Sequence, residues 1–184
     1  MKNKKQFIVH IISGDIMYYL NCFFIYSIFG YLMETIIAFL IKANFKSGIL
    51  TGPWTPVYGI GAVIILFISN YLFKNLHMNR VYETVIMFFI VGVVLSFIEA
   101  LGGVLIEHFF DITFWDYTNQ KYNIGKYISL EMSIIWGIAS IIFIYFLHPI
   151  LNNIIKKIPN WLTIFLILLF LFDSCKTFIT KNKK

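Results

Sequence analysis

Long apolar stretches dominate the chain and are separated by short polar gaps. A helix that crosses the ~30 Å hydrocarbon core of a bilayer needs about 20 mostly apolar residues, because it rises about 1.5 Å per residue. The last such stretch, residues 161–178, is the weakest candidate, because its continuous apolar run ends at Asp173. An interfacial helix is the alternative there. The pattern predicts transmembrane helices over residues 16–41, 56–73, 84–106, 128–147 and 161–178.

These spans predict an all-α integral membrane bundle of about five transmembrane helices, forming a single domain over residues 1–184. Only 13% of the residues are charged, compared with roughly 25% in soluble domains. The formal net charge of +6 comes from lysines in the polar gaps and at both ends, where they can contact lipid headgroups. We therefore expect a multi-pass protein of the cell membrane, with the lipid bilayer as its partner and no nucleic acid.

The segment GILTGPWTPVYGIGA, residues 48–62, interrupts the apolar pattern with glycines and prolines. Thr55 followed by Pro56 is a strong helix start, because a threonine oxygen can cap free amides and proline fits the first helical position. Gly59 and Gly61 are not explained by this start, since glycine inside a helix costs about 1 kcal/mol relative to alanine. They predict that a cavity or a neighbouring helix approaches the backbone there.

Two glutamates lie well inside predicted spans. Glu34 lies about 12 Å along its helix from Lys42, and Glu99 has a similar depth in the third span. An acidic residue at mid-bilayer costs about 2.5–3.5 kcal/mol, so each needs a partner, a proton or water. Small residues share the helix face of each acid, which predicts that both point into the bundle. We interpret them as a binding site; hydrogen bonding in a purely structural role is the alternative.

Other acids and aromatic residues are predicted near the same leaflet. With five crossings, Glu107, Glu131 and Asp173 fall toward the leaflet that holds Glu34 and Glu99. The loop FWDYTNQKYNIGKY, residues 114–127, is too aromatic for a simple solvated connection, and lies along the interface or folds back over the bundle. Within it, Asp116 stands between Trp115 and Tyr117, a pattern that resembles a polar binding group with aromatic stacking surfaces on either side. An ordinary interfacial aromatic belt is the alternative.

The sequence shows none of the common motifs for metal or nucleotide chemistry. It has no C-x-x-C, no H-E-x-x-H and no G-x-x-x-x-G-K-[ST]. We therefore expect no cofactor and no metal. If ATP hydrolysis drives this protein, we expect the ATPase to be a separate chain.

Several segments together resemble one family of small bacterial membrane proteins, called putative ABC-transporter type IV. They are YSIFGYLMET (26–35), GILTGPWTPVYGIGA (48–62), EALGGVLIE (99–107), FWDYTNQKYNIGKYISLEMSIIWG (114–137) and FLHP (146–149). The resemblance covers nearly the whole chain in order. It implies a permease-like protein, and its marked positions include Gly52, Pro53, Pro56, Tyr58, Asn123 and Trp136, and also Asp173.

The residues and the resemblance together predict a set of substrate-binding residues. The set is Tyr31, Glu34, Gly52, Pro53, Trp54, Pro56, Tyr58, Gly59, Gly61, Glu99, Glu107, Trp115, Asp116, Tyr117, Asn123, Glu131 and Trp136. We expect an acidic, aromatic-lined cavity that binds or moves a small cationic or zwitterionic solute. An ATPase subunit or a homo-oligomer is the expected protein partner, because five short helices make a small transporter.

Two other functions fit the same residues. One is a membrane enzyme acting on a lipid-linked substrate, with Glu34, Glu99 or Asp116 as general acid or base. The other is an accessory membrane scaffold without a pocket. Because two spans separate residues 43–53 from residues 109–127, we also expect both segments on the same side of the membrane.

Overall fold

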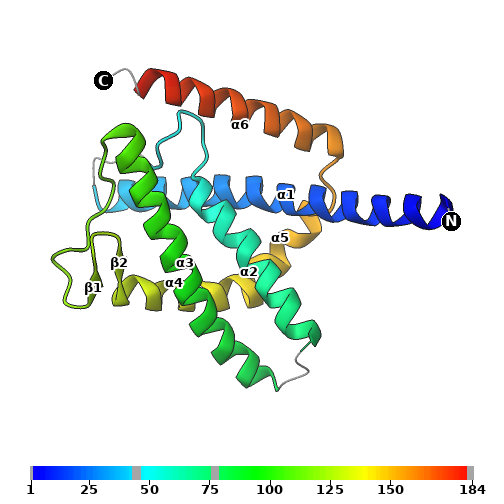
Figure 1. The fold of residues 1–184 in the computed structure, drawn as a ribbon, viewed down its shortest axis with the longest axis horizontal. Coiled ribbons are helices and arrows are strands. Elements are labelled where there is room, and N and C mark those ends of the chain that lie inside the picture. Colours follow the sequence, from blue (N-terminus) through cyan, green and yellow to red (C-terminus); the bar gives the residue numbers. More distant parts are fainter. Residues whose placement is uncertain (1, 43–46, 76–78, 182–184) are drawn as a thin grey trace. The chain divides into compact units, whose positions relative to one another are not determined.

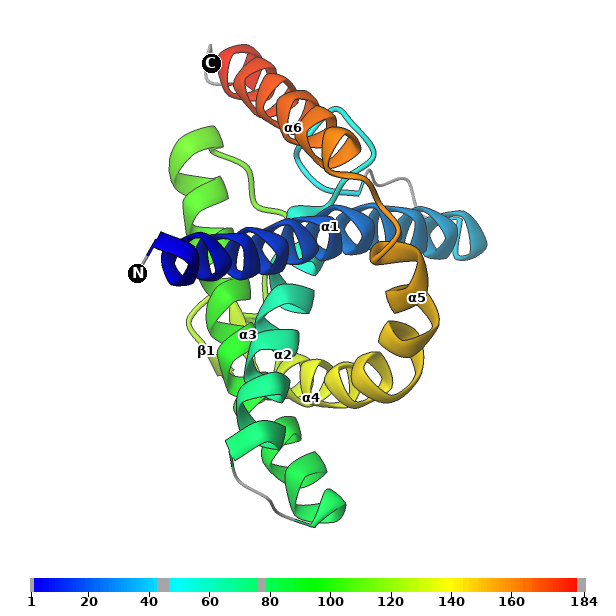
Figure 2. The same cartoon turned by 90° about the vertical axis from the view of Figure 1, so that its right-hand side faces the viewer.

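The computed structural model describes residues 2–42, 47–75 and 79–181, with side chains from residue 16 onward except at 71–75. Figures 1 and 2 show a chain that is almost entirely helical. Its helices are α1 (Lys2–Leu40), α2 (Pro56–Asn75), α3 (Arg80–Phe110), α4 (Leu130–Ile142), the π turn η1 (Phe143–Leu147), α5 (His148–Ile155) and α6 (Asn160–Lys181). The short strands β1 (Asn123–Ile124) and β2 (Ile128–Ser129) precede α4.

The helices confirm the predicted membrane fold. Within the described residues, four helical segments are long and apolar enough to cross a membrane, namely Ile16–Leu40, Arg80–Phe110, Leu130–Ile155 and Asn160–Lys181. A shorter apolar segment, Pro56–Asn70, belongs to α2. Helix α6 continues past Asp173 to Lys181, so the fifth predicted segment has the length that a membrane span needs.

Local sequence explains where these helices begin and end. Helix α2 begins at Pro56, as the Thr-Pro pair predicts. Asn79 caps α3 by accepting a hydrogen bond from the amide of Val81, and Ser129 caps α4 by accepting one from Met132. Helix α3 ends at Phe110 and is capped by Asp111, which adopts a left-handed conformation with φ 54° and donates its amide to the Glu107 carbonyl.

The chain forms two compact units. Unit 1 comprises Met1–Val63 and Leu151–Thr180, and unit 2 comprises Ile64–Ile150 with Lys181–Lys184. The prediction of a single domain concerns how these units assemble in the membrane, and it stays a prediction.

The core of unit 1 gathers around the segment between α1 and α2. Phe24, Leu50 and Trp54 are buried together, and partly buried side chains of α1 and α6 pack against them. Phe170 of α6 contacts the rings of both Phe24 and Trp54 edge-on, at centroid distances of 6.0 and 5.9 Å. The segment that enters α2 is therefore held between α1 and α6, as Figure 1 also shows.

The core of unit 2 is the packing of α3 against α4. A methyl group added at Gly92 would lie 2.8 Å from the Ser133 carbonyl oxygen, and one at Gly137 would lie 2.7 Å from the Phe88 ring. These glycines therefore let the two helices approach closely, as small residues do between membrane helices. The hydroxyls of Ser96 and Ser133 share a hydrogen bond of 2.7 Å across the same contact.

The loop between α3 and α4 contains a small antiparallel hairpin. Strands β1 and β2 pair with Asn123 opposite Ser129 and Ile124 opposite Ile128. Gly125 turns the chain between them with φ +63°, a conformation that glycine adopts without strain. The hairpin delivers the chain to Ser129, the residue that caps α4.

Candidate functional site

In unit 2, the carboxylate of Glu99 is at the centre of a hydrogen-bonded cluster. Glu99 lies on α3 with only 7% of its surface exposed. The Tyr117 hydroxyl donates to one carboxylate oxygen and the Trp136 indole N–H to the other, each at 2.8 Å. The structure thus brings together three of the predicted site residues, which come from α3, the following loop and α4.

The aromatic loop folds back onto α3 at two places. Besides Tyr117, which bonds Glu99, the Tyr127 hydroxyl donates to Glu107 at 2.6 Å. Burial raises the pKa of the Tyr117 hydroxyl, and its hydrogen bond to Glu99 raises it further. Burial also raises the pKa of Tyr127, with the bond to Glu107 as the next cause. Both hydroxyls therefore stay protonated and act as donors at neutral pH.

Glu107 forms an ion pair that the sequence reasoning missed. The Lys126 ammonium contacts its carboxylate and also donates to the Thr113 hydroxyl at 2.9 Å. The hydrogen bond to Glu107 raises the pKa of Lys126. The two residues are nineteen positions apart in sequence, and only the folded-back loop brings Lys126 to Glu107. The two lysines of an otherwise aromatic and polar interfacial loop, Lys121 and Lys126, were the available signal.

In unit 1, Glu34 occupies a similar environment. The Ser47 hydroxyl donates to one of its oxygens at 2.6 Å and the Tyr58 hydroxyl to the other at 2.7 Å. Ser47 also shares a hydrogen bond of 2.5 Å with the Thr55 hydroxyl, next to the start of α2. Gly30 lies against the Tyr58 ring, so a larger side chain at this position would displace the ring.

Asp173 also lies in unit 1; it was predicted near the same leaflet and as a family position, but not as a substrate-binding residue. It is 7% exposed and accepts three hydrogen bonds from the segment before α2. The amides of Thr51 and Gly52 donate at 3.2 and 2.8 Å, and the Trp54 indole N–H donates at 2.8 Å. A single acid in an otherwise apolar helix was the signal that could have placed it in the site.

The three acids Glu34, Glu99 and Asp173 share one electrostatic property. In the part of the chain that the structure describes, their hydrogen-bond donors are hydroxyl, indole and backbone amide groups, and no basic side chain pairs with them. Neutral donors stabilise a carboxylate without cancelling its charge. Glu107 differs, because Lys126 balances it.

The remaining predicted residues have other surroundings. Asp116 is exposed and accepts bonds from the hydroxyl and amide of Thr118, which lower its pKa, the hydroxyl most. Asn123 donates to the Gly125 carbonyl within the hairpin. Gly59 lies against α1, where an added methyl group would meet the Ser27 hydroxyl and the Phe23 carbonyl. Among the other predicted positions, Gly61 is buried, Tyr31, Pro56 and Trp115 are partly buried, and Pro53 and Glu131 are exposed. Whether all of them form one site stays a prediction.

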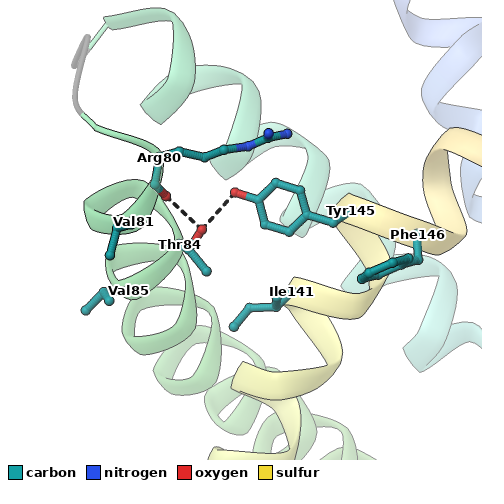
Figure 3. A pocket seen from close by; sticks show the side chains of 7 residues that line it. All are labelled: Arg80, Val81, Thr84, Val85, Ile141, Tyr145 and Phe146. Carbon is teal, nitrogen blue, oxygen red and sulfur yellow. Dashed lines mark hydrogen bonds between the residues drawn. The ribbon is translucent and has the colours of Figure 1, made fainter.

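Unit 2 also carries an apolar groove, which none of the predicted residues lines. It has a volume of about 460 Å³ and lies between the first turns of α3 and the end of α4 with η1. Figure 3 shows the Thr84 hydroxyl between the Arg80 carbonyl and the Tyr145 hydroxyl, with the Arg80 guanidinium 5.2 Å from the Tyr145 ring centre.

The fold and these carboxylates define a multi-pass α-helical membrane protein with ionisable groups inside its spans. The family model described as putative ABC-transporter type IV matches residues 21–179, and the chain belongs to this family. Neither the curated proteins nor the solved structures include a significant match. The match includes every residue that surrounds Glu34, Glu99, Glu107 and Asp173.

Proposed function

We propose that this protein is the membrane subunit of an ABC-type transport system and that Glu99, with Tyr117 and Trp136, binds a small cationic or zwitterionic solute. The observation that carries the proposal is the Glu99 carboxylate, which is buried in a membrane helix and receives only neutral donors among the described residues. An ionised acid at such depth costs about 2.5–3.5 kcal/mol, and ionisable groups inside membranes mark solute pathways. A cationic solute would supply the charge that the donors leave uncancelled.

The donors themselves favour an organic cation. A carboxylate offers about four lone-pair positions, of which Tyr117 and Trp136 occupy two. The rings of tyrosine and tryptophan attract a cation through their electron-rich faces, by about 0.5–2 kcal/mol each. A primary ammonium group could make both kinds of contact, whereas a quaternary ammonium group would gain the attraction to the rings and to the charge of the carboxylate.

A small membrane subunit needs partners to drive transport. The family is described as an ABC transporter, and the sequence carries no phosphate-binding motif of its own. The proposal therefore includes an ATPase on a separate chain, a homo-oligomer of this chain, and the cell membrane as the location. Recovery of a P-loop ATPase with the tagged protein from native membranes would support this part.

Solute binding is tested on the purified protein in detergent. We expect choline, a cation, or glycine betaine, a zwitterion, to raise the thermal midpoint in a saturable manner. Glu99→Gln should weaken binding at the Glu99 site at least about tenfold, because it removes the charge from a buried charge pair. Glu83→Gln, the same change near the start of α3, is the matched control. If neither probe binds, or if Glu99→Gln binds as the unmodified protein does, the proposal is wrong.

A further inference from the structure

Each unit contains a helix–loop–helix segment with the same hydrogen-bond arrangement around a glutamate. In unit 1 the segment is α1, its loop and the start of α2; in unit 2 it is α3, its loop and α4. In both, one oxygen of the glutamate accepts from a loop hydroxyl, and the other accepts from an aromatic side chain on the second helix. The glutamates are Glu34 and Glu99, and the aromatic donors are Tyr58 and Trp136.

The close contact between the two helices is also shared. A glycine directly follows the aromatic donor in both segments, and in both it lies against a phenylalanine of the first helix. Gly59 contacts Phe23, and Gly137 contacts Phe88. Each phenylalanine stands eleven residues before the glutamate of its own segment.

The sequences of the two segments align accordingly. CFFIYSIFGYLME (22–34) matches MFFIVGVVLSFIE (87–99) without a gap, and YGIGAVI (58–64) matches WGIASII (136–142). Burial agrees at four of the matched positions, where Cys22, Tyr26, Ser27 and Gly30 correspond to Met87, Val91, Gly92 and Leu95. It differs at others, most clearly where buried Phe24 corresponds to exposed Phe89. Hydrogen bonding, glycine packing and burial are separate properties, so their agreement at matched positions indicates an internal repeat.

We propose that the chain contains two copies of one helix–loop–helix repeat, and that Glu34, with Ser47 and Tyr58, is a second binding site for a small organic cation. This inference rests on the proposed function, because the first site is that of Glu99. Glu34 meets the same chemical requirement, since its donors are neutral and none of the described basic side chains pairs with it. Transporters are commonly built from such repeats, with binding groups contributed by each.

Saturation binding of radiolabelled choline to the purified protein tests the second site. At a choline concentration that fills the sites of the unmodified protein but not sites weakened tenfold or more, we expect Glu34→Gln and Glu99→Gln each to bind about half as much choline per chain. The double variant should bind little or none. Glu83→Gln should leave the amount unchanged. Full binding in Glu34→Gln would overturn the second site while leaving the proposed function intact. Complete loss in each single variant would also overturn it, because the two acids would then serve one shared site. An absence of saturable choline binding to the unmodified protein would overturn both the second site and the proposed function.

The repeat itself is tested without a ligand. Two double-mutant cycles, read out as thermal midpoints, measure the coupling of each glutamate to its aromatic donor. One combines Glu34→Gln with Tyr58→Phe, and the other combines Glu99→Gln with Trp136→Phe. Because the hydrogen bonds correspond, we expect coupling of the same sign and similar size in both cycles. Coupling at Glu99 with none at Glu34 would show that the two segments are not equivalent.

Discussion

Asp173 illustrates how a single side chain can organise a membrane protein. Its carboxylate receives two backbone amides and the indole of the buried Trp54 side chain. An unsatisfied buried donor costs about 1–3 kcal/mol, so removal of one acceptor side chain affects several groups together. The acid on α6 therefore fixes the shape of the segment that enters α2.

We predict that Asp173→Ala loosens this segment. The amides of Thr51 and Gly52 lose their acceptor, so their hydrogen exchange should accelerate and the thermal midpoint should fall. Exchange measured by mass spectrometry on the peptide that contains them is the readout. Cys175→Ala, an exposed position on the same helix, is the control and should change neither quantity. Unchanged exchange in Asp173→Ala would contradict the anchoring role.

A pair of glycines allows a second prediction at the same scale. A methyl group at Gly59 would meet the Ser27 hydroxyl and the Phe23 carbonyl, whereas one at Gly102 would meet nothing within 4 Å. Gly59→Ala should therefore destabilise the protein by about 1–3 kcal/mol through overpacking. Gly102→Ala should stabilise it by up to about 1 kcal/mol through helix propensity. Thermal unfolding in detergent measures both, and equal effects would remove the packing role of Gly59.

At the scale of elements, the loop between α3 and α4 is attached to α3 through ionisable groups. The pKa of Lys126 is raised mainly by its bond to Glu107, and that of Tyr127 mainly by burial. A raised folded-state pKa stabilises the fold below the unfolded values, about 10.4 for lysine and 10 for tyrosine. This contribution is lost as pH rises through the folded values.

We therefore predict that the effect of Lys126→Gln on the thermal midpoint depends on pH in one direction. The variant should melt below the unmodified protein by a constant amount from pH 7 to about pH 10. The difference should shrink as the pH rises further, because the lysine of the unmodified protein then loses its charge. Lys121→Gln, an exposed lysine of the same loop, is the control. A difference that grows above pH 10 would contradict the assigned ion pair.

Local sequence patterns predict the helices well. The contacts that they do not predict join residues far apart in the sequence. The start of α2 at Pro56 follows from two adjacent residues, and the spans follow from runs of apolar residues. The bond between Trp54 and Asp173 joins residues 119 positions apart, so no local pattern specifies it. The β1–β2 hairpin was also not predicted, since its strands have two residues each and the aromatic content of the loop dominated its interpretation.

At the scale of the whole molecule, the number of spans fixes the side on which each loop lies. Two spans separate Thr51 from Thr118, and both residues are exposed. We predict that cysteines placed at these two positions react with an impermeant reagent from the same side of the membrane. The exposed Cys175 must first be replaced by serine to remove background labelling. Labelling from opposite sides would contradict the five-span topology and any site shared by the two loops.

The internal repeat could have been read from the sequence by aligning the chain with itself. Phe-Phe-Ile recurs at 23–25 and 88–90, and the same spacing leads from each to a glutamate. The loops differ in length and in sequence, which hides the relationship between the second helices. The candidate acids Glu34 and Glu99 were predictable from their depth in apolar spans, whereas their individual donors depend on how each loop folds.

The π turn η1 determines how this chain tolerates a change in length. The amide of His148 donates to the carbonyl of Phe143, five residues earlier, so the turn accommodates one residue more than an α-helix does. Pro149 follows directly, and in an uninterrupted α-helix its ring would clash with the carbonyl of Tyr145. The wide turn therefore acts as a one-residue insertion absorbed within the helix. Deletion of one residue there would restore a regular α-helix and leave the following residues facing nearly as before, but the proline ring would then meet the carbonyl four residues before it.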